Sequence, residues 1–403
     1  METGHAPENY APARNGPLLV FLLLITAILI ITHNARESAS GRHWDFQAFY
    51  LGAEMVSHGE GSRLYDFNDQ AAAQMRYVDP TRQVALPDMP FLNPAATTLL
   101  LLPFARFSMA AAYAAWTAIN VLILVMTVRL LQKVLPLPHD NRPLLAAILF
   151  YPAFDCLLRG QVSILILFLV ALAFYFLIRS RPLLAGFVLG LAILKFQVVL
   201  GLLAVLALRR MWKVLAGSAI GASVVAGVSV LITGWRAAAH YPAYLGQVAF
   251  HERVSYTPSM VNLRAMLWHL LRHEPALWLV ALLSLALLIL AALTWNDIAT
   301  GFSIAVTLSV LTSYHAHYED LSLLILPFAV LLPRVRWNSV LIGIAALVML
   351  LSLIMLILGL ETLFSVLCDG LVIFGLWRTC PRIEDGIAVE PDVMGRRTSA
   401  PAS

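Results

Sequence analysis

Four segments of a largely apolar sequence carry polar side chains that could do chemistry. Carboxylates accept protons, histidines exchange them near neutral pH, and Arg or Lys can hold an anion. Such groups are costly in apolar surroundings unless they are paired or hydrated, so they draw attention as functional candidates. The segments are RHWDF with Asp45, FDCLLRGQVS with Arg159 and Gln161, an isolated Lys195, and SYHAHYEDL with His315, His317, Tyr318, Glu319 and Asp320.

Structural roles compete with chemistry at two of these segments. Asp45 stands at the head of a helical pattern, where an Asp cap stabilises a helix by about 1 kcal/mol. Arg159 follows Asp155 by four residues, which is the spacing of a local ion pair on a helix. Either role can coexist with chemistry, so the surroundings of these residues must decide between the alternatives.

The histidine segment allows a metal site but does not favour one. His315 and His317 are two residues apart, so they would face different sides of a helix, and spacing alone provides no third ligand. Glu319 and Asp320 could simply solvate the end of a loop. We therefore expect neither a metal nor a cofactor.

Composition places the chain among polytopic membrane proteins. Hydrophobic residues make up 60% of the sequence and charged residues 12%, more apolar surface than one soluble core can bury. The net charge of +4 is small and gives no sign of a nucleic-acid partner. The 3 cysteines include no CxxC pair, which argues against a disulfide framework or a zinc knuckle.

About twelve apolar segments follow along the chain, several of them shorter than the roughly 20 residues that span a bilayer. Only Arg14 precedes the first, so we expect a retained helix in place of a cleaved signal peptide. The segments are residues 17–32, 109–131, 143–157, 161–178, 183–194, 196–208, 213–232, 276–294, 299–313, 321–332, 338–358 and 362–377.

Basic residues predict the orientation of these segments. Lys and Arg gather in alternate short loops and in the tail, which places both termini in the cytoplasm. The short outer connections then hold only two basic residues, Arg159 and Lys195. This arrangement requires residues 183–208 to break at Lys195 into two half-length helices. We expect a hairpin packed inside protein, because broken backbone at membrane depth needs protein or water around it.

Two longer segments, residues 33–108 and 233–275, fall on the outer side. In the first, apolar residues recur at helical spacing over 46–56 and Gly59 ends the run, which predicts a helix lying along the membrane surface. Trp44 and Tyr50 are aromatics typical of the interface. We expect one all-α membrane domain over residues 1–378, followed by a disordered cytoplasmic tail over 379–403.

Several stretches together resemble glycosyltransferase family 87. They are WDFQAFYLGAEMVSHGEGSRLYD, FLNPAATTLLLLPF, RGQVSILILFLVAL, LAGFVLGLAILKFQ and SYHAHYEDLSLLILP, in that order over roughly residues 17–340. The sequence departs from the family pattern at Asn93, Ser163, Phe196 and Tyr314, and none of these changes removes an ionisable group. The resemblance implies the GT-C type of fold in a bacterial inner membrane, with the active site on the outer face.

The resemblance also implies a reaction and its partners. A hexose, with mannose as the first expectation, passes with inversion from a polyprenyl-phosphate donor to a glycolipid or glycan acceptor. Asp45 matches the first-loop Asp of the family and would act as general base. The leaving phosphate needs positive charge and donors, which Arg159, Lys195, His315 and His317 could supply. A histidine could instead contact sugar or serve as base. Expected sugar or acceptor contacts are Trp44, Tyr50, Gln161, Tyr318, Glu319 and Asp320.

A transporter or lipid flippase is the main alternative. Transporters tend to show internal repeats and functional residues near the membrane midplane. This sequence shows no repeat, and its ionisable residues gather on one predicted face. Asp369, within an apolar segment near the C-terminus, is the exception that fits a transporter. Catalysis on the outer face remains the favoured interpretation.

Overall fold

A computed structural model describes residues 44–78, 90–249, 257–334 and 361–379. These ranges are helical, and they contain no β-strand. The predicted segments 17–32 and 338–358, as well as the tail beyond residue 379, lie outside the described residues. The all-α prediction is therefore confirmed for the part of the chain that the structure describes.

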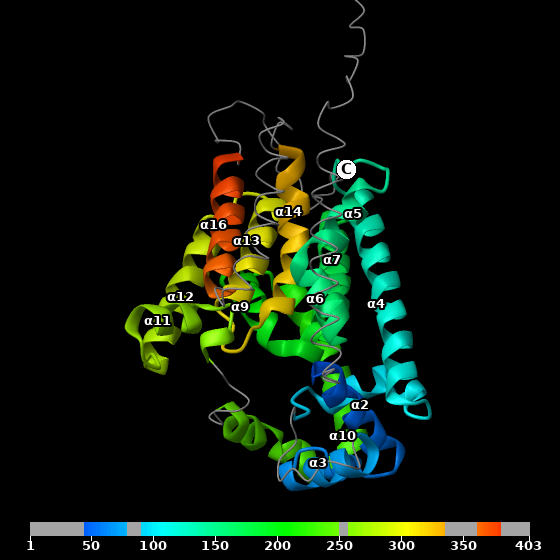
Figure 1. Cartoon of the computed structure of the whole chain (residues 1–403). Coiled ribbons are helices and arrows are strands. Elements are labelled where there is room, and N and C mark those ends of the chain that lie inside the picture. Colours follow the sequence, from blue (N-terminus) through cyan, green and yellow to red (C-terminus); the bar gives the residue numbers. More distant parts are fainter. Residues whose placement is uncertain (1–43, 79–89, 250–256, 335–360, 380–403) are drawn as a thin grey trace, which may run out of the picture.

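Fourteen α-helices account for most of the described chain (Figure 1). They are α2 (Trp44–Ser57), α3 (Phe67–Ala73), α4 (Met109–Gln132), α5 (Arg142–Leu149), α6 (Tyr151–Arg159), α7 (Ser163–Ile178), α8 (Pro182–Leu191), α9 (Leu200–Leu208), α10 (Trp212–Ala249), α11 (Leu263–Leu271), α12 (Leu277–Leu293), α13 (Ile298–Leu311), α14 (Ile325–Leu331) and α16 (Glu361–Thr379). Short 3₁₀ helices η3 (Ala95–Leu100), η5 (Ala192–Val198) and η7 (Tyr318–Leu324) join several of them.

Among the described helices, α4 and α10 are each long and apolar enough to cross a membrane. The bent pair of Pro182–Val198 and Leu200–Leu208 makes a third if it counts as one span. The structure differs from the expectation over residues 143–157, where α5 ends at Leu149 and α6 begins at Tyr151. Pro152 explains the break, because proline lacks an N–H and fits only the first turn of a helix.

The predicted break at Lys195 is confirmed. Helices α8 and α9 flank η5, and the pair is bent by 119°. Lys195 itself has non-helical backbone angles, with φ −131° and ψ 66°. The amide of Asn93 donates a 2.7 Å hydrogen bond to the Leu194 carbonyl, which lies next to the break. A segment distant in sequence therefore holds the backbone that presents Lys195.

Helix α8 lies against α10 along a seam of glycines. A Cβ at Gly190 would collide with the backbone of Ser218 and Gly221, and a Cβ at Gly186 with that of Val214. Small residues let two helices approach this closely and pack their backbones together. The seam anchors the first half of the broken pair against the longest helix of the structure.

Buried apolar side chains form two clusters that meet at the polar segments. One cluster includes Ile164 and fills the bundle around α7, α8, α9, α13 and α14. The other includes Phe46 and Val162, and it joins α2 to residues 91–105, to the first half of α4 and to Tyr244. In Figure 1, α2 and α3 lie at one end of the bundle. The polar segments therefore lie where the two apolar clusters meet, and residues from both clusters surround them.

Helix α2 is more deeply packed than the predicted surface helix. The expected apolar positions Phe46, Phe49 and Tyr50 are at most 5% exposed, but Leu51, on another face, and the acidic Glu54 are also buried. A helix covered on several sides is held firmly by its neighbours. Asp45 lies in the first turn of α2, where a carboxylate interacts favourably with the helix dipole.

Candidate functional site

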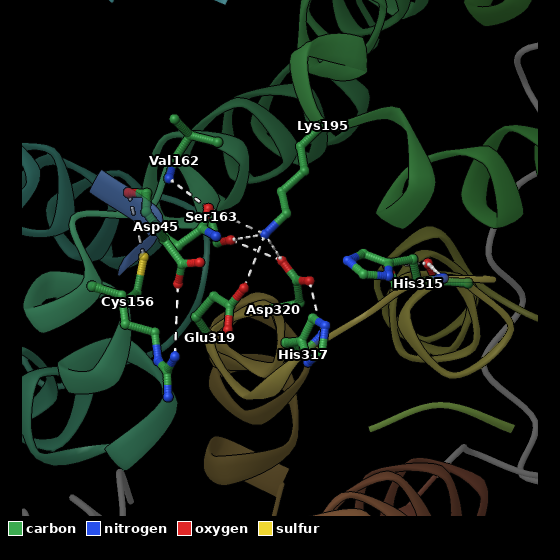
Figure 2. A network of polar contacts seen from close by, with 12 residues as sticks. Asp45, Cys156, Val162, Ser163, Lys195, His315, His317, Glu319 and Asp320 are labelled. Carbon is green, nitrogen blue, oxygen red and sulfur yellow. Dashed lines mark hydrogen bonds and ion pairs between the residues drawn. The ribbon is translucent and has the colours of Figure 1, made fainter. Parts of the chain in front are cut away.

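The four polar segments of the sequence come together at one place (Figure 2). Asp45 comes from α2, and Asp155 and Arg159 come from α6. Gln161 and Ser163 stand at the start of α7, while Lys195 comes from the break after α8. His317, Glu319 and Asp320 come from η7 and the residue before it. The site thus joins segments up to 275 residues apart in the sequence, from Asp45 to Asp320.

Lys195 is the buried centre of this cluster. Its side chain is 5% exposed, and its Nζ lies 2.5 Å from Oδ1 of Asp320 and 3.4 Å from Oε1 of Glu319. The same Nζ donates to Oγ of Ser163 at 2.9 Å and to Oε1 of Gln161 at 3.4 Å. One cation is therefore shared between two carboxylates that would otherwise repel each other in a buried place.

Asp320 is fixed by further hydrogen bonds. The Ser163 hydroxyl donates to Oδ1 at 2.8 Å, and the backbone N–H of His317 donates to Oδ2 at 3.2 Å. The first contact ties η7 to α7, and the second holds the loop that carries the histidines. Asp320 therefore serves as the internal support of the cluster, with an exposed fraction of only 1%.

Asp45 lies at the more open edge of the cluster. Its Oδ2 is 3.8 Å from a terminal nitrogen of Arg159, and the exposed fractions of the two side chains are 11% and 45%. Arg159 also donates from Nε to Oδ2 of Asp155 at 2.8 Å. One guanidinium thus lies between two carboxylates, tightly paired with one and more loosely with the other.

Local packing sets the distance between Asp45 and Arg159. Gly160 ends α6 in the left-handed conformation, with φ 64°, which glycine adopts without strain. A Cβ at this position would meet the side chain of Phe46, the residue after Asp45. The indole N–H of Trp116 donates to the Gly160 carbonyl at 2.8 Å, and the Tyr113 hydroxyl donates to the Leu158 carbonyl at 2.7 Å.

The two histidines lie beside the charges and are half-buried. Their ring centroids are 4.7 Å apart, with the planes at 81°. Tyr314 is 43% exposed, and its ring lies between those of Phe196 and His315 at 6.3 Å and 6.2 Å. Within the described ranges, no group of three or more His, Cys, Asp or Glu side chains is arranged to hold a metal ion.

The environment separates the acidities of the carboxyl groups. Burial raises the pKa of Asp45 to about 6, with a further contribution from Glu319, while Arg159, His317 and Lys195 oppose the rise. Burial also acts to raise the pKa of Glu319, but Lys195, His317 and Arg159 outweigh it and lower that pKa to about 2. Glu319 thus stays ionised, whereas Asp45 can exchange a proton near neutral pH.

Burial likewise shifts two neighbouring groups. It raises the pKa of Asp320 against the attraction of Lys195. It lowers the pKa of His315 well below the usual value, and the charges of His317 and Lys195 add to that effect. His315 is therefore neutral at pH 7 and can both donate and accept hydrogen bonds.

The other predicted site residues are placed less centrally. Tyr50 is buried, and its hydroxyl donates to the Phe107 carbonyl at 2.8 Å, a contact that holds α2 to the chain before α4. Tyr318 is 5% exposed and packs its ring against Tyr151 at 5.0 Å. The side chain of Trp44 lies outside the described part of the structure. Asp369 is buried in α16, where Ser365 donates to it at 3.3 Å.

Sequence reasoning did not give Asp155, Ser163 or Asn93 a place in the site. The spacing of Asp155 predicts only a local pair with Arg159, yet Asp155 forms the closest contact that Arg159 has. At Ser163 and Asn93 the sequence shows only a departure from the family pattern. Their contacts with Lys195 and with the Leu194 carbonyl depend on tertiary packing, for which the sequence carries no spacing signal.

Comparison with known proteins identifies the family. The sequence model of glycosyltransferase family 87 matches residues 91–314, which is more than half of the chain and covers Arg159 and Lys195. No curated protein and no solved structure matches the chain. The apolar helices together with this family indicate a membrane protein. The chain belongs to glycosyltransferase family 87 and is a glycosyltransferase.

Proposed function

We propose that this enzyme transfers a hexose, with mannose as the first candidate, from a polyprenyl-phosphate donor to a glycolipid or glycan acceptor. The transfer proceeds with inversion at the outer face of a bacterial inner membrane, in a GT-C type fold with about twelve membrane segments. The observation that carries the proposal is the pairing of a partly accessible carboxylate, Asp45, with a half-exposed guanidinium, Arg159. The first suits proton removal from an acceptor, and the second suits a phosphate.

Asp45 is the proposed general base. The acceptor hydroxyl attacks the anomeric carbon and gives its proton to the Asp45 carboxylate, while the bond from that carbon to the donor phosphate oxygen breaks. A base works best when its pKa lies near the working pH. With a pKa of about 6, roughly nine-tenths of Asp45 is ionised at pH 7. Glu319, with a pKa of about 2, is a much weaker base for this task.

Arg159 is the strongest candidate for direct contact with the departing phosphate. Its side chain is 45% exposed, and its planar fork matches phosphate oxygens while Nε stays on Asp155. The half-buried His315 and His317 can add hydrogen bonds to the same phosphate. Lys195 is 5% exposed and already paired, so we propose that it acts on the phosphate through its field.

The remaining polar residues are proposed to hold the sugar or the acceptor. Gln161 is close to Lys195, and its amide N–H₂ group can donate to a sugar hydroxyl. Glu319 is 3% exposed, so its proposed part is to orient the Lys195 ammonium group beside the sugar. Tyr318 and Asp320 are buried, so their proposed part is to support the side chains that contact the sugar. Trp44 keeps its proposed place near the acceptor, and Tyr50 is proposed to act there by holding α2 in position.

A transfer assay with the purified full-length protein tests the proposal. The protein, reconstituted in lipid nanodiscs, is given polyprenyl-phosphate mannose, polyprenyl-phosphate glucose or a nucleotide sugar, together with a membrane lipid extract as acceptor. We expect a new glycolipid from at least one polyprenyl-phosphate donor, with the anomeric configuration inverted, and none from the nucleotide sugar. Transfer from the nucleotide sugar alone, or retention of configuration, would contradict the proposal.

A further inference from the structure

Asp155 is a buried carboxylate to which the proposed mechanism gives no part. Its side chain is 4% exposed, and it accepts a 2.8 Å hydrogen bond from Nε of Arg159. The Tyr151 hydroxyl lies 3.5 Å from its other oxygen. Burying a carboxylate is costly, and a local ion pair alone adds little to a helix. The position of this carboxylate therefore calls for a reason beyond helix stability.

The contacts of Arg159 are unequal. Its Nε meets Asp155 at hydrogen-bond distance, whereas its terminal nitrogen stays 3.8 Å from Asp45. A tight pair of Arg with a carboxylate is typically about 2.7–2.9 Å between nitrogen and oxygen. Asp45 and Arg159 are thus close enough to attract each other but are not hydrogen-bonded.

Two features hold this arrangement in place. Asp155 and Arg159 are four residues apart on α6, so the helix itself sets their pairing. On the other side, Phe46 packs against Gly160 and fixes the first turn of α2 with respect to the end of α6. Neither carboxylate needs to move for Arg159 to change partners, because the long Arg side chain alone can swing.

We propose that Asp155 is a positioning residue, which holds the Arg159 guanidinium on its own side and so leaves the Asp45 carboxylate free to accept a proton. The inference rests on the proposed function, because it assumes that Asp45 is the base. If Asp155 loses its charge, Arg159 turns toward Asp45 and forms a tight pair with it. Such a pair lowers the pKa of an Asp by roughly 1 to 3 units and makes it a weaker base.

The other charges around Asp45 do not offset the fall in its pKa that pairing with Arg159 would cause. Asp45 is faced by Arg159 from α6, by Lys195 from the break, and by His317 and Glu319 from η7 and the residue before it. Asp155 is faced by Arg159, Tyr151 and Glu319. Lys195 is held by its own carboxylates, and Glu319 remains ionised in its pair with Lys195. Arg159 is therefore the group whose orientation changes when Asp155 loses its charge.

The test is the pH profile of kcat/KM for sugar transfer by the full-length protein. For the wild type we expect an acidic limb near pH 6, set by Asp45. In Asp155→Asn the limb should move to lower pH by about one unit or more, and the plateau rate should fall by up to about tenfold. Asp155→Glu keeps the charge and the i,i+4 pair, so its limb should stay near that of the wild type.

Controls separate positioning from folding. Asp140→Asn makes the same change at an exposed carboxylate and should leave the profile unaltered. If Asp155→Asn does not fold, Tyr151→Phe removes one hydrogen bond from Asp155 and should move the limb in the same direction by less. The inference is overturned if folded Asp155→Asn keeps the acidic limb of the wild type. It is also overturned if Asp155→Glu shifts the limb as much as Asp155→Asn does.

The outcome also distinguishes this inference from the proposed function. If Asp45→Asn retains wild-type activity, Asp45 is not the base, and the base assignment and the role of Asp155 fail together, while the donor assay still decides the proposed transfer. If Asp45→Asn is inactive while Asp155→Asn keeps the wild-type limb, the proposed function stands and the positioning role of Asp155 is wrong.

Discussion

Replacing Lys195 by Met tests how the buried charge cluster is held together. Met keeps most of the length of the side chain but removes the charge that lies 2.5 Å from Asp320 and 3.4 Å from Glu319. Loss of one partner from a buried ion pair typically costs about 3 to 5 kcal/mol, because it leaves an uncompensated charge. We expect the free energy of unfolding to fall by that amount at pH 7.

The pKa of Glu319 sets the pH dependence of this effect. Lys195, His317 and Arg159 together lower that pKa from 4.5 to about 2, which corresponds to about 3 kcal/mol of stabilisation of the ionised form. The folded pKa is depressed, so this stability is fully present above pH 4.5 and is lost as the pH falls toward 2. The difference between the wild type and Lys195→Met should therefore narrow below pH 4.5.

Unfolding of the purified protein in mixed micelles, titrated with a denaturing detergent, measures this difference. A double-mutant cycle with Glu319→Gln should show coupling, since both changes act on one ion pair. Arg142→Met breaks an exposed pair with Asp140 and should change nothing measurable. Wild-type stability of Lys195→Met at pH 7, or strict additivity with Glu319→Gln, would show that Lys195 does not stabilise the two buried carboxylates.

Three further predictions concern the elements around the cluster. Gly190→Ala should destabilise the protein by about 1 to 3 kcal/mol in the same unfolding assay, because its Cβ meets the backbone of α10; Gly227→Ala, which has open space, is the control, and equal effects would contradict the close packing. Asn93→Ala should lower kcat with little change in KM for donor, because it frees the Leu194 carbonyl beside the helix break; unchanged kcat would show that this bond does not position the site. Arg159→Lys should lose at least about tenfold in kcat/KM, since a point charge does not replace the fork between two carboxylates; full activity would mean that charge alone suffices.

The sequence was sufficient to predict which polar segments would meet. Arg159 and Lys195 break the charge bias that is predicted for the outer connections, and this exception is visible in the sequence alone. The helix break at Lys195 also followed from orientation, since one continuous helix would put the next basic cluster on the wrong side. Both inferences use the general cost of charge in apolar surroundings, which acts on any fold.

The pairing within the cluster could not be predicted. Lys195 takes Glu319 and Asp320 as partners more than 120 residues away, and no local spacing specifies such a contact. The sequence therefore left Lys195 available to bind phosphate, whereas the structure encloses it between two acids. The same limit applies to Asn93, whose partner is a backbone carbonyl that any residue could have supplied.

Helix packing modified two other expectations. The periodicity of residues 46–56 predicted one apolar face, but the structure also buries Leu51 and Glu54. Periodicity shows which side of a helix is apolar. It does not show whether another segment packs over a side that carries both polar and apolar residues. Similarly, the apolar run 143–157 contained Pro152, a strong local signal that divides it into α5 and α6.

The central claim is that Asp45 takes the proton of the acceptor, and one measurement tests it most directly. Single-turnover transfer by Asp45→Asn in the full-length protein is compared with that of Asp140→Asn at pH 7. We expect Asp45→Asn to fold and bind donor as the wild type does but to transfer sugar about 10²- to 10⁴-fold more slowly, while Asp140→Asn is unaffected. Transfer by folded Asp45→Asn at the wild-type rate would contradict it.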